Sequence, residues 1–251
     1  MLTSTAFATV LHDPDALLAE PLMAAAPGLA ETFAGVAVSL TEATHPSIEQ
    51  LMRDRLGARV GRHPTGEAFI GQGRRHGVAL ALDWGADRVI YADPDHMLRW
   101  LTSYPDELQS VLATQPEVGF LIIGRSARAF ADVPRRLQET EAPINQAYEL
   151  LTGRPADLLS AVRRMDRAAA RDIVANSSVD SFGNDVEWPL LAERLGHQVG
   201  YVEADGLTYR TIEQYGAAAD SYDAEPLQWI RRIEMAAVQA TAMRPYLRPA
   251  E

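Results

Sequence analysis

Arg88-Val-Ile-Tyr-Ala-Asp93-Pro94-Asp95-His96 is the stretch that decides the fold. Its apolar run, Val89 to Ala92, is typical of a buried strand, and it stops at two aspartates separated by a proline, which has no N–H for a sheet ladder. In an open α/β sheet, ligands bind outside the carboxyl ends of the strands. Two carboxylates there suit Mg²⁺ or Mn²⁺ holding a substrate's phosphates, because Mg²⁺ typically takes only one or two protein carboxylates.

The same residues also fit an ordinary helix start. Asp93 would then be an N-cap, with Pro94 at the first helical position and Asp95 at the positive end of a helix that continues through Met97. A short acidic motif does not decide between a helix cap and a metal site. Both interpretations therefore stay open at this point.

The composition favours a single domain. With 251 residues, 47% of them hydrophobic, the chain can bury one large core, and no Ser/Gly-rich linker or low-complexity run divides it. The formal net charge of −11 argues against nucleic acid and anionic membranes as partners. It does not exclude a phosphorylated ligand held locally by arginines and a metal. The absence of cysteine excludes disulfides, thiolate metal sites and cysteine nucleophiles.

The sequence carries no visible targeting or membrane signal. Met1 to Leu11 has no basic leader, and no apolar run approaches the ~20 residues of a membrane span. We therefore expect a soluble cytoplasmic protein without a transmembrane segment.

Strand and helix patterns alternate along the chain. The first half predicts strands at 5–11, 35–40 and 58–60 and helices at 15–26 and 48–56, the second helix ending at Gly57. Further along we expect strands at 118–124, 199–202 and 207–210, and helices at 78–84, 105–113, 133–151, 168–175 and 226–243. This alternation predicts an α/β fold, with a mostly parallel central sheet flanked by helices and right-handed crossovers.

A segment rich in glycine and arginine, Gly71-Gln-Gly-Arg74-Arg75-His-Gly77, precedes the opening stretch and leads into the helix expected at 78–84. Its glycines would let the backbone approach a ligand, and Arg74 or Arg75 would meet a diphosphate. The alternative is that these arginines are solvated surface, which is the usual place for charged side chains. The segment is neither a Rossmann fingerprint nor a P-loop.

A second acidic stretch lies at 180–191, where a loop carrying Gly183 leads into a helix. The first turn of that helix holds Asp185 and Glu187, with Asn184 as the expected cap. Acids in a first helical turn are common because they favour the positive end of the helix dipole. The functional alternative is that one of these carboxylates acts as a general base.

In this order, the segments resemble the GT-A-type nucleotide-sugar glycosyltransferases of family 2. The resemblance rests on Gly71-Gln-Gly-Arg74, on Val-Ile-Tyr-Ala-Asp93-Pro-Asp95 as the D-x-D motif, on Phe182-Gly-Asn-Asp185-Val-Glu187 and on the segment 194–209, and it covers about residues 5 to 212. It implies a GT-A, Rossmann-like domain over 1–212. Residues 213–251 would form a C-terminal helical extension, packed on that domain or on a second subunit of a homodimer.

The resemblance also implies an activity, namely metal-dependent transfer of a sugar from a nucleoside-diphosphate sugar to an acceptor hydroxyl, with inversion. Asp95 and Asp93 would hold Mg²⁺ or Mn²⁺, and Asp185 would be the general base. Arg74 or Arg75 would stabilise the leaving diphosphate. The remaining roles are donor contacts for His12, Glu42 and Asp93, and acceptor contacts for Arg163, Glu187 and Trp188.

Within this family, residues 145–167 are similar to the polyprenol-phosphate mannosyltransferase branch, but the identity of the acceptor is not carried over from it, and we expect a small-molecule or lipid-linked acceptor. Ala161 stands where that branch has a loop glycine. The first strand ends in His12-Asp13-Pro14 instead of Pro-x-Tyr-Asn, and the second ends in Thr41-Glu42 instead of paired acids. These positions contact the nucleotide in the family, so the sequence does not predict the base.

Two other functions fit the same features. One is a sugar nucleotidyltransferase, which would form a nucleoside-diphosphate sugar from a sugar phosphate and a nucleoside triphosphate. The other is a relative of the fold that binds a nucleotide without catalysis, because a fold does not by itself determine a function.

Overall fold

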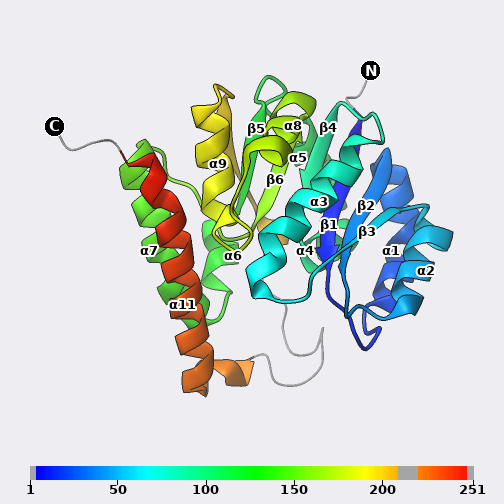
Figure 1. The fold of residues 1–251 in the computed structure, drawn as a ribbon, viewed down its shortest axis with the longest axis horizontal. Coiled ribbons are helices and arrows are strands. Elements are labelled where there is room, and N and C mark those ends of the chain that lie inside the picture. Colours follow the sequence, from blue (N-terminus) through cyan, green and yellow to red (C-terminus); the bar gives the residue numbers. More distant parts are fainter. Residues whose placement is uncertain (1–3, 209–219, 248–251) are drawn as a thin grey trace.

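The computed structural model describes residues 4–208 and 220–247, and within these ranges seven strands form one sheet (Figure 1). In chain order they are β1 (Thr5–Leu11), β2 (Gly35–Thr41), β3 (Arg59–His63), β4 (Arg88–Tyr91), β5 (Phe120–Arg125), β6 (Val162–Asp166) and β7 (Val199–Ala204). In space the order is β3-β2-β1-β4-β6-β5-β7. Strand β6 is antiparallel to both neighbours, and the other pairs are parallel. The mostly parallel sheet predicted from the sequence is therefore confirmed.

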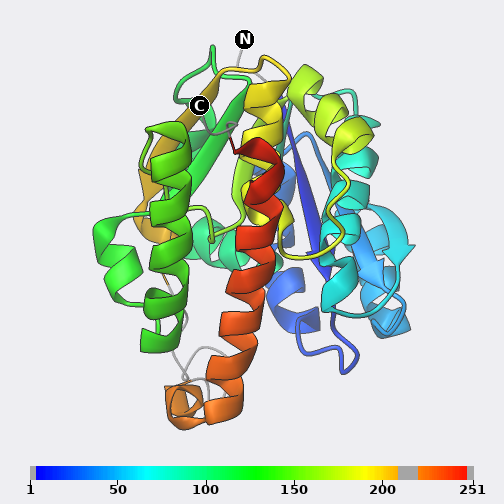
Figure 2. The ribbon, with the colours of Figure 1, turned by 60° about the vertical axis from the view of Figure 1, so that its left-hand side comes forward.

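Helices cover both faces of the sheet (Figures 1 and 2). One face packs against α1 (Ala19–Thr32), α2 (Pro46–Leu56), α4 (Pro94–Ser103) and α5 (Pro105–Ala113). The other packs against α3 (Ile70–Leu82), α7 (Arg135–Thr152), α8 (Arg167–Asn176), α9 (Asn184–Arg194) and α11 (Pro226–Met243). The short helix α6 (Ala127–Ala131) follows β5. No helix in the described ranges is long and apolar enough to cross a bilayer.

Strand β1 shows why the central strands are nearly continuous apolar runs. Ala6 and Ala8 belong to the core beneath α3, whereas Phe7 and Leu11 belong to the core beneath α1 and α2. Successive side chains of a strand point to opposite faces, so a strand buried on both faces is apolar at most of its positions.

Some helix ends lie where the sequence predicts them, and others do not. Helix α2 ends at Gly57, whose φ of 58° is the left-handed C-terminal conformation that glycine favours. The C-terminal helix spans 226–243, as predicted. The first helix, expected at 15–26, instead runs from Ala19 to Thr32. Pro21 therefore lies in its first turn, where the missing N–H costs no hydrogen bond.

The structure corrects the sequence-based prediction for the glycine- and arginine-rich segment. Residues 71–77 are the body of α3 and not a loop before it. The glycines are needed for close packing, because a Cβ at Gly73 would collide with the His63 ring, and one at Gly77 would come within 2.8 Å of the Thr9 carbonyl oxygen. Their absent side chains bring α3 directly onto the sheet and onto the loop before α9.

Strand β6 was not predicted. Its sequence, Val162-Arg163-Arg164-Met165-Asp166, lacks the apolar pattern of a buried strand, yet both arginines are buried. Each guanidinium donates to backbone carbonyls, Arg164 for example to that of Thr114, so the burial of these charges is partly compensated. A strand was expected at 207–210, but Asp205–Leu207 form a 3₁₀ turn. The rest of that prediction falls partly on residues 209–210, which lie outside the described ranges.

Helix α11 packs against α7 and α9 of the same chain (Figure 2). Its buried residues are Gln239 and Met243. Ile230 and Ile233 on this helix are more than half exposed, at 51% and 57%. A homodimer contact through this helix stays a prediction.

Candidate functional site

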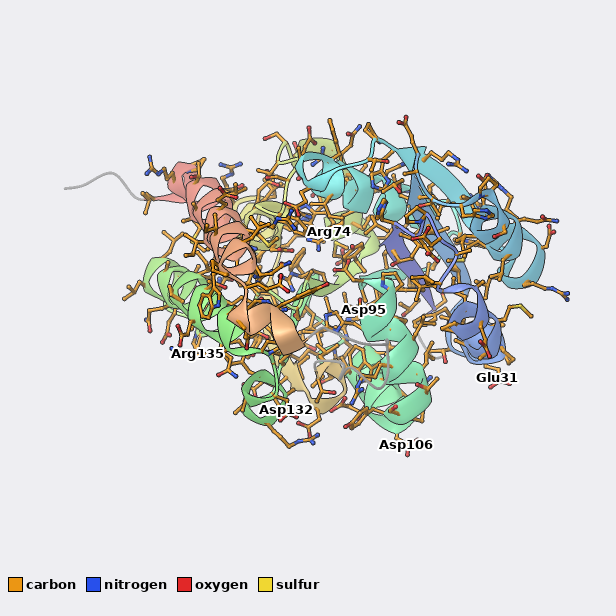
Figure 3. All side chains as sticks on the ribbon, turned by 90° about the horizontal axis from the view of Figure 1, so that it is seen from below. Glu31, Arg74, Asp95, Asp106, Asp132 and Arg135 are labelled. Atoms are coloured by element: carbon orange, nitrogen blue, oxygen red, sulfur yellow. The ribbon has the colours of Figure 1, made fainter. Side chains whose placement is uncertain are left out.

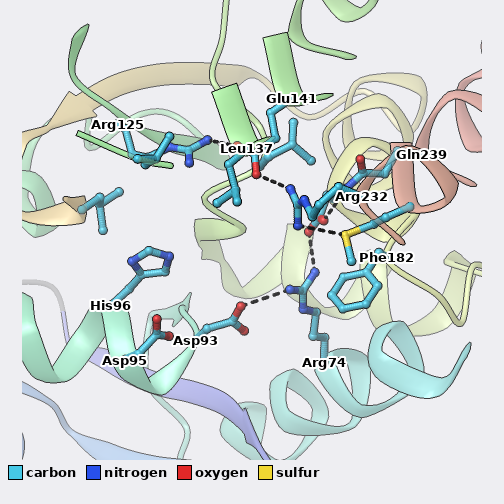
Figure 4. A pocket seen from close by; sticks show the side chains of 15 residues that line it. Arg74, Asp93, Asp95, His96, Arg125, Leu137, Glu141, Phe182, Arg232 and Gln239 are labelled. Carbon is cyan, nitrogen blue, oxygen red and sulfur yellow. Dashed lines mark hydrogen bonds and ion pairs between the residues drawn. The ribbon is translucent and has the colours of Figure 1, made fainter. Parts of the chain in front are cut away.

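A cavity of about 200 Å³ lies at the edge of the sheet where β4 ends. Viewed from that edge, Arg74 of α3 and Asp95 of α4 lie near the middle of the molecule (Figure 3). The charged and polar side chains that line the cavity come from several elements and are Arg74, Asp93, Asp95, His96, Arg125, Glu141, Asp185, Arg232 and Gln239. Apolar side chains, among them Leu137 and Phe182, complete its wall (Figure 4).

Asp93 occupies a helix-cap position without using its side chain as a cap. It directly precedes α4, whose first residue is Pro94, and its carboxylate makes no cap hydrogen bond. Instead Oδ1 accepts a hydrogen bond from the Tyr91 hydroxyl, and Oδ2 pairs with Arg74 Nη2 at 3.2 Å. The backbone thus begins a helix while the carboxylate faces the cavity, so a helix start and a cavity-lining acid occur in the same residue.

Arg74 joins the two acidic motifs. Its side chain is buried, and Nε donates to the Tyr91 hydroxyl at 3.0 Å. Nη1 donates to Asn184 Oδ1 at 3.0 Å and to Asp185 Oδ1. A single buried cation therefore holds together Asp93, from the end of β4, and Asp185, from the first turn of α9.

The carboxylate of Asp185 is bound on both oxygens. Besides Arg74 on Oδ1, Gln239 Nε2 of α11 donates to Oδ2 at 3.1 Å. The backbone carbonyl of Asp185 accepts from Arg163 Nη2 at 3.0 Å. The expected cap, Asn184, is the first residue of α9 and uses its side chain to accept from Arg74, so the cap position falls to Gly183.

Burial and charge act in opposite directions on these groups. Burial raises the pKa of Asp185, although Arg74 and Arg163 oppose this rise. Burial also raises the pKa of Tyr91 well above its usual value. Burial disfavours the charged form of Arg74, but Asp185, Tyr91 and Asp93 outweigh it and raise the pKa of Arg74. Asp185 therefore sits where a carboxylate is a stronger base than in water.

The opposite wall of the cavity is a second buried charge network. Arg125, at the end of β5, pairs with Glu141 of α7 at 2.5 Å and with Asp157 at 2.7 Å. Glu141 also pairs with Arg232 of α11. Asn145 of α7 donates to Asp157 at 3.1 Å. These contacts tie α7 and α11 to the end of β5, so that the C-terminal helix forms part of the cavity wall.

Arg163, Glu187 and Trp188, predicted on the acceptor side, lie in the core and do not line the cavity. Arg163 donates to the carbonyls of Leu158 and Asp185. Glu187 accepts from the Ser177 hydroxyl at 2.5 Å, and Trp188 Nε1 donates to the same hydroxyl at 3.2 Å. Their polar atoms serve the loop before α9 and the start of that helix, which is why all three can be buried.

The other predicted donor contacts lie outside the cavity. Arg75 turns away from it and binds the Val179 carbonyl at 2.7 Å and the Asp180 carboxylate. His12 and Glu42 follow β1 and β2 at the same edge of the sheet. The His12 ring is hydrogen-bonded to the Thr41 hydroxyl at 2.8 Å, and this contact joins the two strand ends.

The side chains of Asp95 and Asp93 are hard oxygen donors of the kind that Mg²⁺ and Mn²⁺ prefer. Both line the cavity, with His96 beside them (Figure 4). Within the described residues, no group of three or more His, Asp or Glu side chains could hold a metal. That result is compatible with a metal that takes one or two carboxylates and completes its shell from a phosphate ligand and water.

Several residues in or behind the cavity wall were not singled out from the sequence. The pattern around Tyr91 indicates only an apolar strand, although the hydroxyl of this residue contacts both Arg74 and Asp93. Glu141 and Gln239 do carry a signal, because each is a polar residue on the buried face of a helix. A buried polar residue in an apolar stripe has to find a partner, and such positions are candidates for a site.

No protein-family model matches the chain, and no curated protein matches it in sequence. Solved structures match it in fold. Glucosyl-3-phosphoglycerate synthase from Mycobacterium tuberculosis, in complex with Mn²⁺, UDP and glucosyl-3-phosphoglycerate, gives a TM-score of 0.60 at 14% identity. The match covers 97% of this chain and 80% of that one.

Two further complexes of that enzyme also match this chain in fold. With Mn²⁺, UDP-glucose and glycerol 3-phosphate bound, the TM-score is 0.60 at 14% identity, over 97% and 80% of the two chains. With Mg²⁺ and UDP bound, it is 0.53 at 14% identity, over 92% and 80%. The resemblance to the polyprenol-phosphate branch stays a prediction. At this level of identity the likeness shows the fold, and this chain has the GT-A fold of these glycosyltransferases.

Proposed function

We propose that this protein is a metal-dependent glycosyltransferase that moves a sugar from a nucleoside-diphosphate sugar to an acceptor hydroxyl. The observation that carries the proposal is the meeting of Asp93 and Asp185 on Arg74 in one cavity at the end of β4, within a GT-A fold. The complexes of the M. tuberculosis enzyme with Mn²⁺ or Mg²⁺ and UDP or UDP-glucose support the choice of donor and metal.

Asp95 and Asp93 are the proposed metal ligands. When bound, Mg²⁺ or Mn²⁺ would neutralise negative charge on the leaving diphosphate. Asp95 is assigned the main metal contact as the family resemblance implies, and Asp93, which also accepts hydrogen bonds from Tyr91 and Arg74, assists it. The donor nucleoside would then extend along the sheet edge toward His12 and Glu42.

Asp185 is the proposed general base. A carboxylate has about four lone-pair sites, and Arg74 and Gln239 each donate to one of its oxygens, so other sites can accept the proton of an acceptor hydroxyl. Its raised pKa brings it closer to the range in which a base works best near neutral pH. Attack from the face opposite the diphosphate would invert the anomeric centre, which NMR of the product tests directly.

The acceptor side is the wall formed by α7 and α11, opposite Asp95 (Figure 4). The acceptors of the M. tuberculosis complexes are small phosphorylated molecules, which favours a small-molecule acceptor over a lipid-linked one. For Arg163, Glu187 and Trp188 we propose a positioning role in place of acceptor contact, because their polar atoms hold the start of α9.

Calorimetry tests the donor and the metal together. UDP, GDP and their glucose and mannose derivatives are titrated into the native protein with and without Mn²⁺. We expect binding of at least one of them that requires Mn²⁺ and that Asp95→Ala abolishes. Metal-independent binding, or no binding by any of these nucleotides, would contradict the proposed function.

A further inference from the structure

Helix α11 brings a neutral side chain to the proposed base. Gln239 is 2% exposed, and its Nε2 donates to Asp185 Oδ2 at 3.1 Å, across 54 residues of sequence. Figure 4 shows Gln239 at the edge of the cavity, on the side formed by α11. This contact is independent of the ion pair that joins the same helix to Glu141.

A buried glutamine on a packing face needs an explanation. Burying an amide is unfavourable unless it is hydrogen-bonded, and Met243, one turn further along, shows that an apolar residue suits this face. The partner of Gln239 also fixes its orientation. An ionised carboxylate only accepts hydrogen bonds, so the amide must present Nε2.

The other groups around Asp185 are charged. Arg74 of α3 donates to Oδ1, Arg163 of β6 donates to the backbone carbonyl, and Asp93 at the end of β4 is the nearby like charge. A third cation on Oδ2 would stabilise the carboxylate and weaken it as a base. A neutral amide orients the same oxygen with a smaller effect on its basicity.

We propose that Gln239 is a positioning residue, which holds the Asp185 carboxylate with its remaining lone pairs toward the cavity. This inference rests on the proposed function, because Asp185 matters here as the base. It makes α11 a part of the reaction site and not only a packing element.

The test compares two glutamines of one helix. Gln239→Met keeps the length of the side chain and removes the donor, and Gln228→Met makes the same change near the start of α11, away from the cavity. The carboxyl carbon of Asp185, assigned by loss of its signal in Asp185→Asn, is titrated by ¹³C NMR in each protein. Thermal unfolding of each variant shows whether it is folded.

We expect the pKa of Asp185 to rise by about one pH unit in Gln239→Met, because a hydrogen bond to its charged form is lost. It should stay unchanged in Gln228→Met. An unchanged titration in Gln239→Met, or an equal change in both variants, would overturn the inference. If Gln239→Met does not fold, Gln239→Leu, which also removes the donor, carries the same test with the same rise expected.

This readout needs no acceptor and is separate from the test of the proposed function. Failure of Mn²⁺-dependent nucleotide binding would remove the proposed reaction, whatever the titration of Asp185. Conversely, intact donor binding together with an unmoved Asp185 pKa in the Gln239 variants would leave the glycosyltransferase proposal standing and remove the role of Gln239.

Discussion

Arg74 shows how one residue can decide the chemistry of a site. Its guanidinium is buried among Tyr91, Asp93 and Asp185, so the two carboxylates share one positive charge. Buried ion pairs of this kind contribute little net stability, but removing one member is costly. The pairing keeps the proposed base and the proposed metal-binding stretch at a fixed separation, which is what transfer between two bound substrates requires.

The variant that tests Asp185 as the general base is Asp185→Asn. We expect it to lower sugar transfer by at least about a hundredfold, because an amide cannot take the proton of the acceptor hydroxyl. Donor binding should be nearly unchanged, since the carbonyl oxygen of the introduced amide can still accept from Arg74. The measurement is release of the nucleoside diphosphate, in the presence of Mn²⁺, from the sugar donor that calorimetry identifies, beside calorimetry of that donor. Retained turnover would refute the assignment of the base.

Among the elements, α11 depends on close contact with the start of α9. Gly183 precedes α9 with an ordinary negative φ of −58°, so its role is not conformational. A Cβ at this position would lie 2.9 Å from Ala242 Cβ and 3.4 Å from the Val238 carbonyl oxygen, both in α11. The missing side chain lets α11 approach closely enough for Gln239 to reach Asp185.

Gly183→Ala should therefore move α11 away from α9. We expect a loss of about 1–3 kcal/mol in the free energy of unfolding, as for other overpacked contacts, measured by urea denaturation. Gly28→Ala in α1 is the matched control, because its nearest neighbour would be 3.8 Å away and alanine favours helix. Equal stability of the Gly183 variant and the native protein would show that the contact between Gly183 and α11 can accommodate a Cβ.

For the whole molecule, folding buries a titratable side chain near the sheet edge, and this makes stability depend on pH. His63 ends β3, is 4% exposed, and is hydrogen-bonded to the Ser39 hydroxyl at 2.8 Å. Burial, together with the nearby His76, lowers its pKa to about 4. The folded protein therefore holds His63 neutral over a pH range in which the unfolded chain would protonate it.

The free energy of unfolding should therefore decrease as the pH falls below 6.5. Between its ordinary pKa of 6.5 and about 4, the unfolded state binds more protons at His63, so the stability that is fully present above pH 6.5 is lost as the pH falls. The loss reaches about 3 kcal/mol. Denaturation curves from pH 7.5 to 4 should show it in the native protein and not in His63→Gln, which shares all the carboxylates. Parallel curves for the two proteins would contradict the buried neutral state.

Elements whose residues carry a local signal could be predicted from the sequence. The apolar runs predicted β1, β2, β4 and β5, glycine predicted the end of α2, and helical spacing placed α11 to the residue. Asp93, Asp95 and Asp185 were candidates because acids at strand and helix ends are visible in sequence, and all three line one cavity.

The partners of those residues depend on how distant segments pack, and local patterns do not predict them. Strand β6 was invisible because Arg163 and Arg164 are buried through carbonyls that other segments supply. Residues 71–77 are helical although glycine disfavours a helix, and their glycines are needed because a Cβ at Gly73 or Gly77 would meet His63 or Thr9. Gln239 reaches Asp185 through the packing of α11 on α9. A contact between residues so far apart in the chain produces no periodic pattern in the sequence. Local patterns specify secondary structure, whereas long-range packing assembles the site.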